Sequence, residues 1–203
     1  MKNANKIIPL REQIADQLRS DIISGDLPPD TKLNETMLAE RFGVSRGPIR
    51  DVIIELTKEG LLLTKQNRGA SVNSALDADI QELMFGVRLK IEEFAAKKVK
   101  GKMLQEDFSA LETILQNLLE AFNKEDYTEV TKQDIEFHRY LVDKAGGEDL
   151  TNLWSSIIMR MRISYARLDN ASDCFNEHKA ILDALRENNT MQVVAALRSN
   201  IKP

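Results

Sequence analysis

The segment Leu38–Leu56, LAERFGVSRGPIRDVIIEL, carries the clearest structural pattern in this chain. Apolar residues recur at helical spacing on both sides of a three-residue break that begins at Gly43, so the segment predicts two helices joined by a tight turn. Gly43 can end the first helix, and Ser45 is a suitable cap for the second. Arg46 and Arg50 then lie one turn apart, on one face, at the start of the second helix.

The flanking residues complete a small domain. Residues 10–24 carry apolar side chains at every fourth position, which predicts an amphipathic helix. Asn34 can cap a short helix in which Met37, Leu38 and Phe42 are expected to face inward. Residues 61–73, LLLTKQNRGASVN, predict a strand, a turn and a second strand. Three helices followed by a two-stranded wing form a winged helix-turn-helix domain, to which we assign residues 1–74.

The pattern changes after this domain, where long amphipathic segments follow one another without further strand signals. Glycine and asparagine residues mark the breaks between the segments. The sequence therefore predicts an all-α helical bundle of about six helices for residues 75–203, and a mainly α fold for the whole chain. The expected helices lie near residues 77–99, 104–123, 127–145, 149–169, 173–188 and 190–201.

Composition places the chain among soluble globular proteins, because 42% of its 203 residues are hydrophobic and 30% are charged. No apolar run approaches the ~20 residues that a membrane span requires, and the N-terminal stretch turns polar after Leu10. A single cysteine, Cys174, excludes an internal disulfide framework. We therefore expect a cytoplasmic location.

Charge is distributed unevenly along the chain. Residues 1–74 hold 11 Lys and Arg against 10 Asp and Glu, a net charge of +1, whereas the whole chain carries −4. The remaining residues are therefore net acidic. This asymmetry indicates that the two parts have different partners.

The start of a recognition helix meets base edges and phosphates in the major groove of DNA. Arg46 has the reach to contact a guanine bidentately, while Ser45 and the free N–H groups of the first turn can bind a phosphate. At the wing tip, Gly69 permits a tight turn, and Arg68 can enter the minor groove. The alternative is that the two arginines of the helix are simply solvated.

The stretch PPDTKLNETMLAERFGVSRGPIRDVIIELTKEGLL, followed by NRGASVN, resembles the DNA-binding domain of the GntR family of bacterial transcription regulators. The resemblance covers about residues 8–73. Members usually have threonine where this chain has Gly47, so a hydroxyl and a methyl group that could touch DNA are lost. The resemblance implies double-stranded DNA as a partner. We assign the DNA contacts to Thr36, Ser45, Arg46, Gly47, Arg50, Arg68 and Gly69.

The helical part contains a candidate metal site. Asp134 and His138 lie four residues apart on one face of an expected helix, and His178 lies on a later helix. A carboxylate and two imidazoles that converge inside a bundle are ordinary ligands for zinc or another divalent ion. The alternative is a local pair between Asp134 and His138, with His178 capping a helix.

Four segments of this part, ELMFGVRLKIEEFAAKKV, DIEFHRYLVDKAGG, EHKAILDAL and AALRSN, appear in the order seen in the FCD domain of the FadR branch of the GntR family. The resemblance implies a bundle that responds to small molecules, often carboxylic acids. Many members bind a divalent metal ion through Asp, His, His and His. Asp134, His138 and His178 match the first three ligands, and Asn200 stands at the fourth position. We therefore expect one divalent metal ion (Zn or similar), held less tightly because an amide oxygen is a weaker ligand than imidazole.

Three arginines are candidates for binding an effector. Arg88 matches an arginine that many such domains direct into the pocket, and a guanidinium suits a carboxylate. Its alternative role is an ion pair with Glu92, four residues further on. Arg160 and Arg162 come from an expected helix that should border the cavity, and for both the alternative is solvation.

The combined expectation is a ligand-responsive regulator that binds a palindromic operator as a homodimer, because one recognition helix covers only a half-site. Its small-molecule effector would be an organic acid, sensed together with the divalent metal ion. Two alternatives remain open: a metal-dependent enzyme built on the helical domain, and a DNA-binding protein whose helical domain only dimerises. No separate general base is evident, so we expect a protein that is not an enzyme.

Overall fold

The helix-turn-helix around Gly43 is present in the computed structural model, which describes residues 9–65, 69–163 and 171–201. Gly43 adopts a left-handed conformation with φ of 65°, and the side chain of Asn34 accepts hydrogen bonds from backbone N–H groups of the helix that it caps. The apolar face of the next helix is buried, as expected. The three helices are α1 (Leu10–Ile23), α2 (Glu35–Phe42) and α3 (Arg46–Lys58).

Two details of the expected core are wrong. Met37 is 67% exposed, because the eight-residue helix α2 turns Leu38, as expected, and Ala39 toward the core, but not Met37. Leu10, the first residue of the expected apolar stripe of α1, is likewise exposed, whereas Ile14 and the later members of that stripe are buried.

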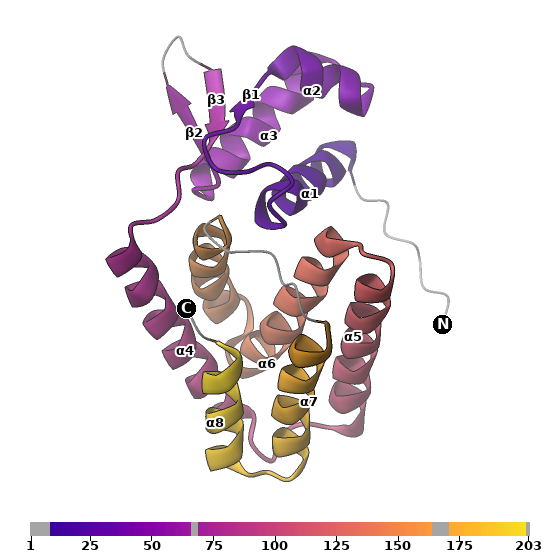
Figure 1. Ribbon diagram of the computed structural model, residues 1–203, viewed down its shortest axis with the longest axis vertical. Helices are drawn as coiled ribbons and strands as arrows, with labels where there is room; N and C mark the ends of the chain where they lie inside the picture. The colour runs from indigo at the N-terminus through magenta and orange to yellow at the C-terminus, as the bar shows by residue number, and fades with distance from the viewer. Residues whose placement is uncertain (1–8, 66–68, 164–170, 202–203) are drawn as a thin grey trace.

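A three-stranded antiparallel sheet completes the winged domain, with strand order β1-β3-β2. Strands β2 and β3 form the expected wing, whereas β1 was not predicted because two residues give no alternating pattern. The turn of the wing, which includes Arg68, lies outside the described residues (Figure 1). The strands are β1 (Lys32–Leu33), β2 (Leu62–Lys65) and β3 (Gly69–Val72).

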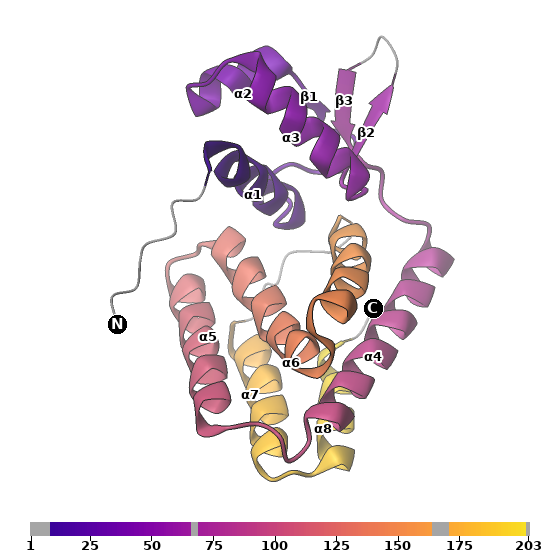
Figure 2. The same cartoon turned by 180° about the vertical axis from the view of Figure 1, so that it is seen from behind.

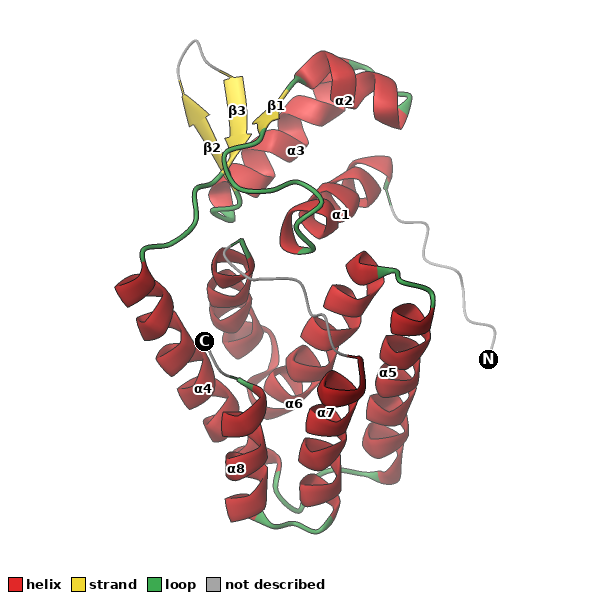
Figure 3. Ribbon diagram, viewed as in Figure 1, coloured by secondary structure: helices red, strands yellow, loops and turns green. Residues whose placement is uncertain are grey.

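Helices account for all the regular secondary structure that is described after β3 (Figure 3). They are α4 (Ala78–Val99), α5 (Gln105–Asn123), α6 (Tyr127–Arg162), α7 (Ala171–Arg186) and α8 (Thr190–Asn200). Of these and the earlier helices, as far as they are described, none is both long and apolar enough to cross a membrane. The chain is therefore mainly α, with an N-terminal winged helix-turn-helix domain and a C-terminal helical domain.

Helix α6 consists of two helical segments joined at Gly147, whose backbone is not helical (φ 61°, ψ −155°). These segments correspond to the expected helices near residues 127–145 and 149–169, and the end of the second lies outside the described residues. Asp134 and Arg162 form an ion pair although a straight helix would place them ~42 Å apart. The bend at Gly147 therefore folds α6 back and brings its two segments to one site.

We expect Gly147→Ala to lower the free energy of unfolding by about 1–3 kcal/mol, because its φ and ψ are accessible almost only to glycine. Denaturant titration measures this change. Gly86→Ala in α4 is the matched control, since a Cβ there would meet open space. That variant should gain about 0.5–1 kcal/mol from the better helix former. Wild-type stability in Gly147→Ala would contradict the importance of the bend.

Helix α1 lies between α3 and the helical bundle and contacts both α3 and α6 (Figures 1 and 2). Near the start of α6, the hydroxyl of Thr128 donates a hydrogen bond of 2.9 Å to Asp26. Near its other end, Arg160 packs beside Gly60, where an added Cβ would lie 3.9 Å from the arginine Cδ. Buried apolar side chains of the two domains form one continuous cluster. Helix α6 thus touches the winged domain at both of its ends.

Candidate DNA-binding surface and metal centre

The first turn of α3 forms an exposed polar surface that contains Ser45, Arg46, Gly47 and Arg50. The Nε of Arg50 donates a hydrogen bond of 2.8 Å to the carboxylate of Glu35 in α2. Within the described part of the chain, the Arg46 side chain has neither an ion pair nor a hydrogen bond. Arg46 can therefore engage a ligand without breaking an existing contact, whereas Arg50 has to leave Glu35.

Ser45 occupies the N-cap position of α3, but its side chain makes no capping hydrogen bond. Its hydroxyl and the first N–H groups of the helix are therefore available to an anion such as a phosphate. Thr36, in the first turn of α2, is half-buried, and its backbone N–H already donates to Asn34 at 2.8 Å. Only the hydroxyl of Thr36 can serve a further partner.

The wing adds positive charge that the sequence reasoning did not single out. Gly69 begins β3 with φ of 76° and lines a hollow together with Lys32, Lys65 and the single carboxylate of Asp30. Lys65 pairs with Gly69 across the hairpin, and Lys32 pairs with Ser71 in β3. Side chains alternate between the two faces of a sheet. This rule could have placed the two lysines together only if β1 had been recognised as a third strand.

A cluster of polar side chains lies buried inside the helical domain. Asp134 and His138 from α6 and His178 from α7 each offer one ligand atom, and these atoms lie within 4.8 Å of one another. Both histidines are fully buried, and their ring centroids are 5.1 Å apart. Phe137 packs edge-on against both rings. The three expected ligands are therefore brought together.

The hydrogen bonds of the two histidines fix how their rings are oriented. The Nδ1 of His138 donates to the carboxylate of Glu92 at 2.6 Å, and the Nδ1 of His178 donates to the backbone carbonyl of Cys174 at 2.7 Å. Neither Nε2 has a hydrogen-bond partner among the described residues. The Nε2 of His178 lies 3.2 Å from an Asp134 oxygen, but not along a hydrogen-bond direction. Both imidazoles thus keep an Nε2 lone pair for another partner.

Glu92 on α4 is the centre of the surrounding network. Its carboxylate accepts hydrogen bonds of 2.8 Å from Arg88 and from the indole N–H of Trp154, in addition to the one from His138. Burial by itself would raise the pKa of Glu92, but the contacts with His138 and Arg88 hold that pKa well below its usual range. Burial lowers the pKa of His138 to about 4, so its imidazole is neutral. Sequence reasoning named Glu92 only as the alternative partner of Arg88; its link to His138 spans 46 residues.

The three candidate effector arginines occupy different places. Arg88 is buried and paired with Glu92, the alternative considered above. Arg160 is half-buried beside Gly60, and desolvation lowers its pKa. Arg162 is buried and forms an ion pair with Asp134, so it contacts one of the three expected metal ligands directly.

Asn200, the expected fourth ligand, is half-buried near the end of α8, and its amide lies 3.4 Å from the carboxylate of Glu177. The other three residues fit a divalent ion. They supply one carboxylate and two Nε2 lone pairs, and the opposite nitrogens are fixed by a carboxylate and a carbonyl, as is usual for metal-binding histidines.

A winged helix-turn-helix with a free arginine at the start of its recognition helix, joined to a helical bundle, defines a DNA-binding transcription regulator. The chain belongs to the GntR family: the model for bacterial regulatory proteins of the gntR family matches residues 10–72, and the FCD domain model matches residues 83–202. The protein is a regulator rather than an enzyme. The family combination is consistent with the FadR branch.

Relatives of the chain carry names of the same kind. It is 32% identical over 190 residues to the HTH-type transcriptional regulator YdhC of Bacillus subtilis (strain 168), covering 91% of this chain and 84% of that protein. It is 26% identical over 205 residues to the HTH-type transcriptional repressor RspR of Escherichia coli (strain K12), covering 98% and 88%. The solved structure of E. coli McbR/YncC superposes with a TM-score of 0.82 at 18% identity, covering 96% of this chain and 94% of that chain, and so shows the same fold.

Proposed function

We propose that the protein is a homodimeric regulator whose winged domain, residues 1–74, reads a palindromic operator, and whose helical domain, residues 75–203, senses an organic acid together with a divalent ion. It would act in the cytoplasm, where bacterial DNA is found. One observation carries the proposal: the same chain has an exposed arginine at the start of its recognition helix, Arg46, and a buried cluster of possible metal ligands in its helical domain. The cluster consists of Asp134, His138 and His178.

Arg46 is the residue to which we assign base recognition, because a guanidinium at the start of a recognition helix can bind guanine bidentately. Ser45 and the N–H groups near Gly47 are assigned to a phosphate, and Arg50 joins them when it leaves Glu35. The wing contributes through Gly69, with Lys32 and Lys65 beside it, and through Arg68 and the hydroxyl of Thr36.

In the helical domain, Asp134, His138 and His178 would hold the divalent ion, and the family resemblance assigns the fourth position to Asn200. A bound ion supplies a positive centre that can accept a carboxylate oxygen of the effector. Arg162 lies against Asp134 and is assigned to the same carboxylate. Arg88 supports Glu92, and Arg160 stands at the contact between the domains, so their effect on the effector is indirect.

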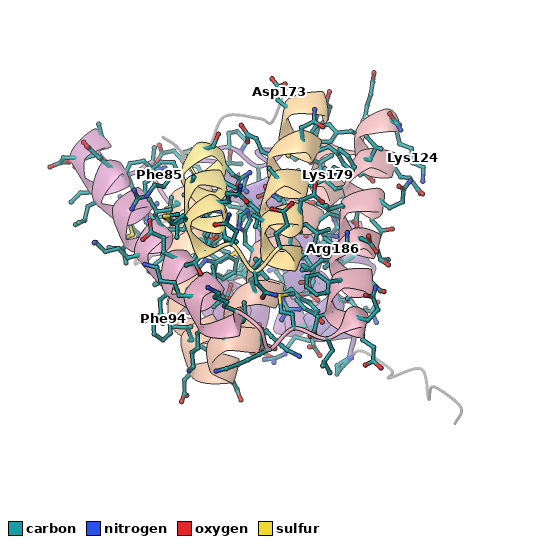
Figure 4. The ribbon with its side chains drawn as sticks, turned by 90° about the horizontal axis from the view of Figure 1, so that it is seen from below. Phe85, Phe94, Lys124, Asp173, Lys179 and Arg186 are labelled. Atoms are coloured by element: carbon teal, nitrogen blue, oxygen red, sulfur yellow. The ribbon has the colours of Figure 1, made fainter. Side chains whose placement is uncertain are left out.

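The outer face of α4 supports the homodimer. Ile80, Leu83, Val87 and Phe94 are 36–63% exposed and recur at intervals of three, four and seven residues, which places them in one stripe. Figure 4 shows Phe94 at the outer edge of α4, whereas Phe85 lies toward α8. A second copy can cover this stripe in an isologous interface, with the same helix contributed by both protomers.

Leu83→Glu is expected to convert the dimer to monomer at micromolar concentration, because it places a charge at the centre of the apolar stripe. Light scattering measures the molar mass. Met191→Glu is the matched control, since Met191 is 82% exposed but lies on α8. Loss of the dimer in the control, or its retention in Leu83→Glu, would show that the stripe is not the interface.

Helix α6 supports the coupling of the two domains. It carries Asp134, His138 and Arg162, and its ends contact the winged domain through Thr128 and Arg160. Binding at the cluster can therefore change the relative placement of the two winged domains of a dimer, provided that the ligand binds one arrangement better than another.

Selection from a pool of random DNA duplexes tests the proposed recognition. The wild-type protein should enrich an inverted repeat whose half-sites are centred about one helical turn apart, or a multiple of it, as two-fold symmetry requires. Enrichment of a single unrepeated site would contradict the dimeric mode of binding, and a pool without any enriched sequence would contradict specific recognition.

A further inference from the structure

Four charged side chains are buried together around the two histidines. Glu92 is paired with Arg88, and Asp134 is paired with Arg162. All four residues are at most 5% exposed. The imidazoles carry no net charge while each keeps its Nδ1 proton and its Nε2 lone pair. Among the residues that the structure describes, the two carboxylates and the two guanidinium groups therefore cancel one another, and this set of side chains is electrically neutral.

A divalent ion among Asp134, His138 and His178 would add two positive charges to this neutral, buried cluster. Uncompensated buried charge is strongly unfavourable, so the ion requires either the departure of a cation or the arrival of an anion. Asp134 is the only anionic member of the ligand set, and the Arg162 guanidinium already binds its Oδ2 atom, while the Nε2 of His178 lies 3.2 Å from its Oδ1 atom. The guanidinium and the ion therefore compete for one buried carboxylate.

We propose that Arg162 is a built-in competitor of the metal ion, and that the ion binds Asp134 only by displacing this guanidinium. The inference rests on the metal site of the proposed function and adds the residue that sets its affinity. Displacement leaves Asp134 to the ion and separates the Arg162 guanidinium from this carboxylate. A guanidinium that has left Asp134 can turn to a carboxylate group of the effector.

Arg162 lies at the end of α6 that contacts the winged domain, so the exchange can affect that domain. Arg162 is the last residue of α6, and the carbonyl of its neighbour Met161 accepts a hydrogen bond of 3.4 Å from Gln81 of α4. Arg160, two residues earlier, packs beside Gly60 at the end of α3. A change of partner at Arg162 therefore acts on the end of α6 that touches the winged domain.

Calorimetric titration of the chelator-treated full-length protein with Zn²⁺ tests the exchange. Arg162→Met keeps much of the side-chain volume and removes the charge, so its Zn²⁺ dissociation constant should fall at least about tenfold below that of wild type, since a nearby positive charge opposes a divalent ion. Arg160→Met is the matched control: it removes the same group from the same helix without touching Asp134, and its affinity should stay within about twofold of wild type.

A thermal melt gives a second readout. Without the ion, Arg162→Met leaves Asp134 buried without its cation, so its midpoint should lie below that of wild type, and Zn²⁺ should raise it by more than it raises wild type. A variant that folds only with Zn²⁺ also supports the exchange. A variant that fails to fold even with Zn²⁺ contradicts it, because the ion then cannot replace the guanidinium.

The remaining outcomes separate this inference from the function on which it rests. Equal or weaker Zn²⁺ binding in Arg162→Met, with measurable binding in wild type, overturns the exchange and leaves the metal site intact. Absence of Zn²⁺ binding at millimolar concentration in both proteins overturns the exchange and the metal site together. Specific DNA recognition is tested independently by the duplex selection.

Discussion

Arg46→Ala is expected to weaken binding to the selected duplex by about 1–3 kcal/mol, which corresponds to roughly 5- to 150-fold in the dissociation constant. The reason is that Arg46 is exposed at the start of α3 and has no ion pair among the described residues, so its guanidinium is free to contact a base. Preference for the base that it contacts should relax as well. Fluorescence anisotropy on the selected duplex and on single-base variants measures both effects.

Lys58→Ala is the matched control for this variant. Lys58 is an exposed cation in the last turn of the same helix, ~18 Å from Arg46 along the helix axis. Its loss removes one positive charge without touching the bases, and should change affinity for all duplexes to a small and equal extent. If the two variants lose equal affinity and keep the same base preference, Arg46 is not a recognition residue.

His178→Ala should weaken Zn²⁺ binding by more than about 100-fold, because it removes a direct ligand, and even the loss of an outer hydrogen-bond partner costs 10- to 100-fold. Calorimetry measures the affinity. The emission of Trp154, the only tryptophan, provides a second signal, because its indole is hydrogen-bonded to the Glu92 that holds His138. Lys179→Ala is the control, since Lys179 is an exposed neighbour on α7 paired with Asp183.

Asn200→His provides the opposite test of the same site. If Asn200 stands at the fourth ligand position, an imidazole there would be a better ligand than the amide, so Zn²⁺ should bind more tightly than in wild type, and its addition should raise the thermal midpoint further. Unchanged affinity in Asn200→His, together with full Zn²⁺ binding in His178→Ala, would place any bound ion elsewhere in the protein.

The fold was largely predictable because local signals agreed with the tertiary structure. Gly43 with its left-handed backbone, the cap at Asn34 and the apolar stripe that starts at Ile49 each specify a local conformation, and together they define the helix-turn-helix. Strand β1 escaped prediction because its pairing with β3 depends on residues some 40 positions apart, which no local pattern records. Met37 was misplaced because a helix of two turns has too few residues to define its buried face.

The site was predictable only in part. Asp134 and His138 could be paired from their spacing of four, and His178 was placed with them by family resemblance rather than by geometry. The partner of Arg162 could not be read from the sequence, because the bend at Gly147 alone brings it to Asp134. The role of Glu92 was missed because helix packing, rather than spacing in the sequence, brings it to His138 and Trp154.

If the proposed function is correct, binding at the buried cluster controls the affinity of the winged domain for DNA. The affinity of wild type and of His178→Ala for the selected duplex should be measured with and without Zn²⁺. We expect Zn²⁺ to change the wild-type dissociation constant at least about fivefold, the lower end of typical coupling between sites, and to leave that of His178→Ala unchanged. Wild-type DNA affinity that is the same in both conditions, while calorimetry shows the ion bound, would contradict the account.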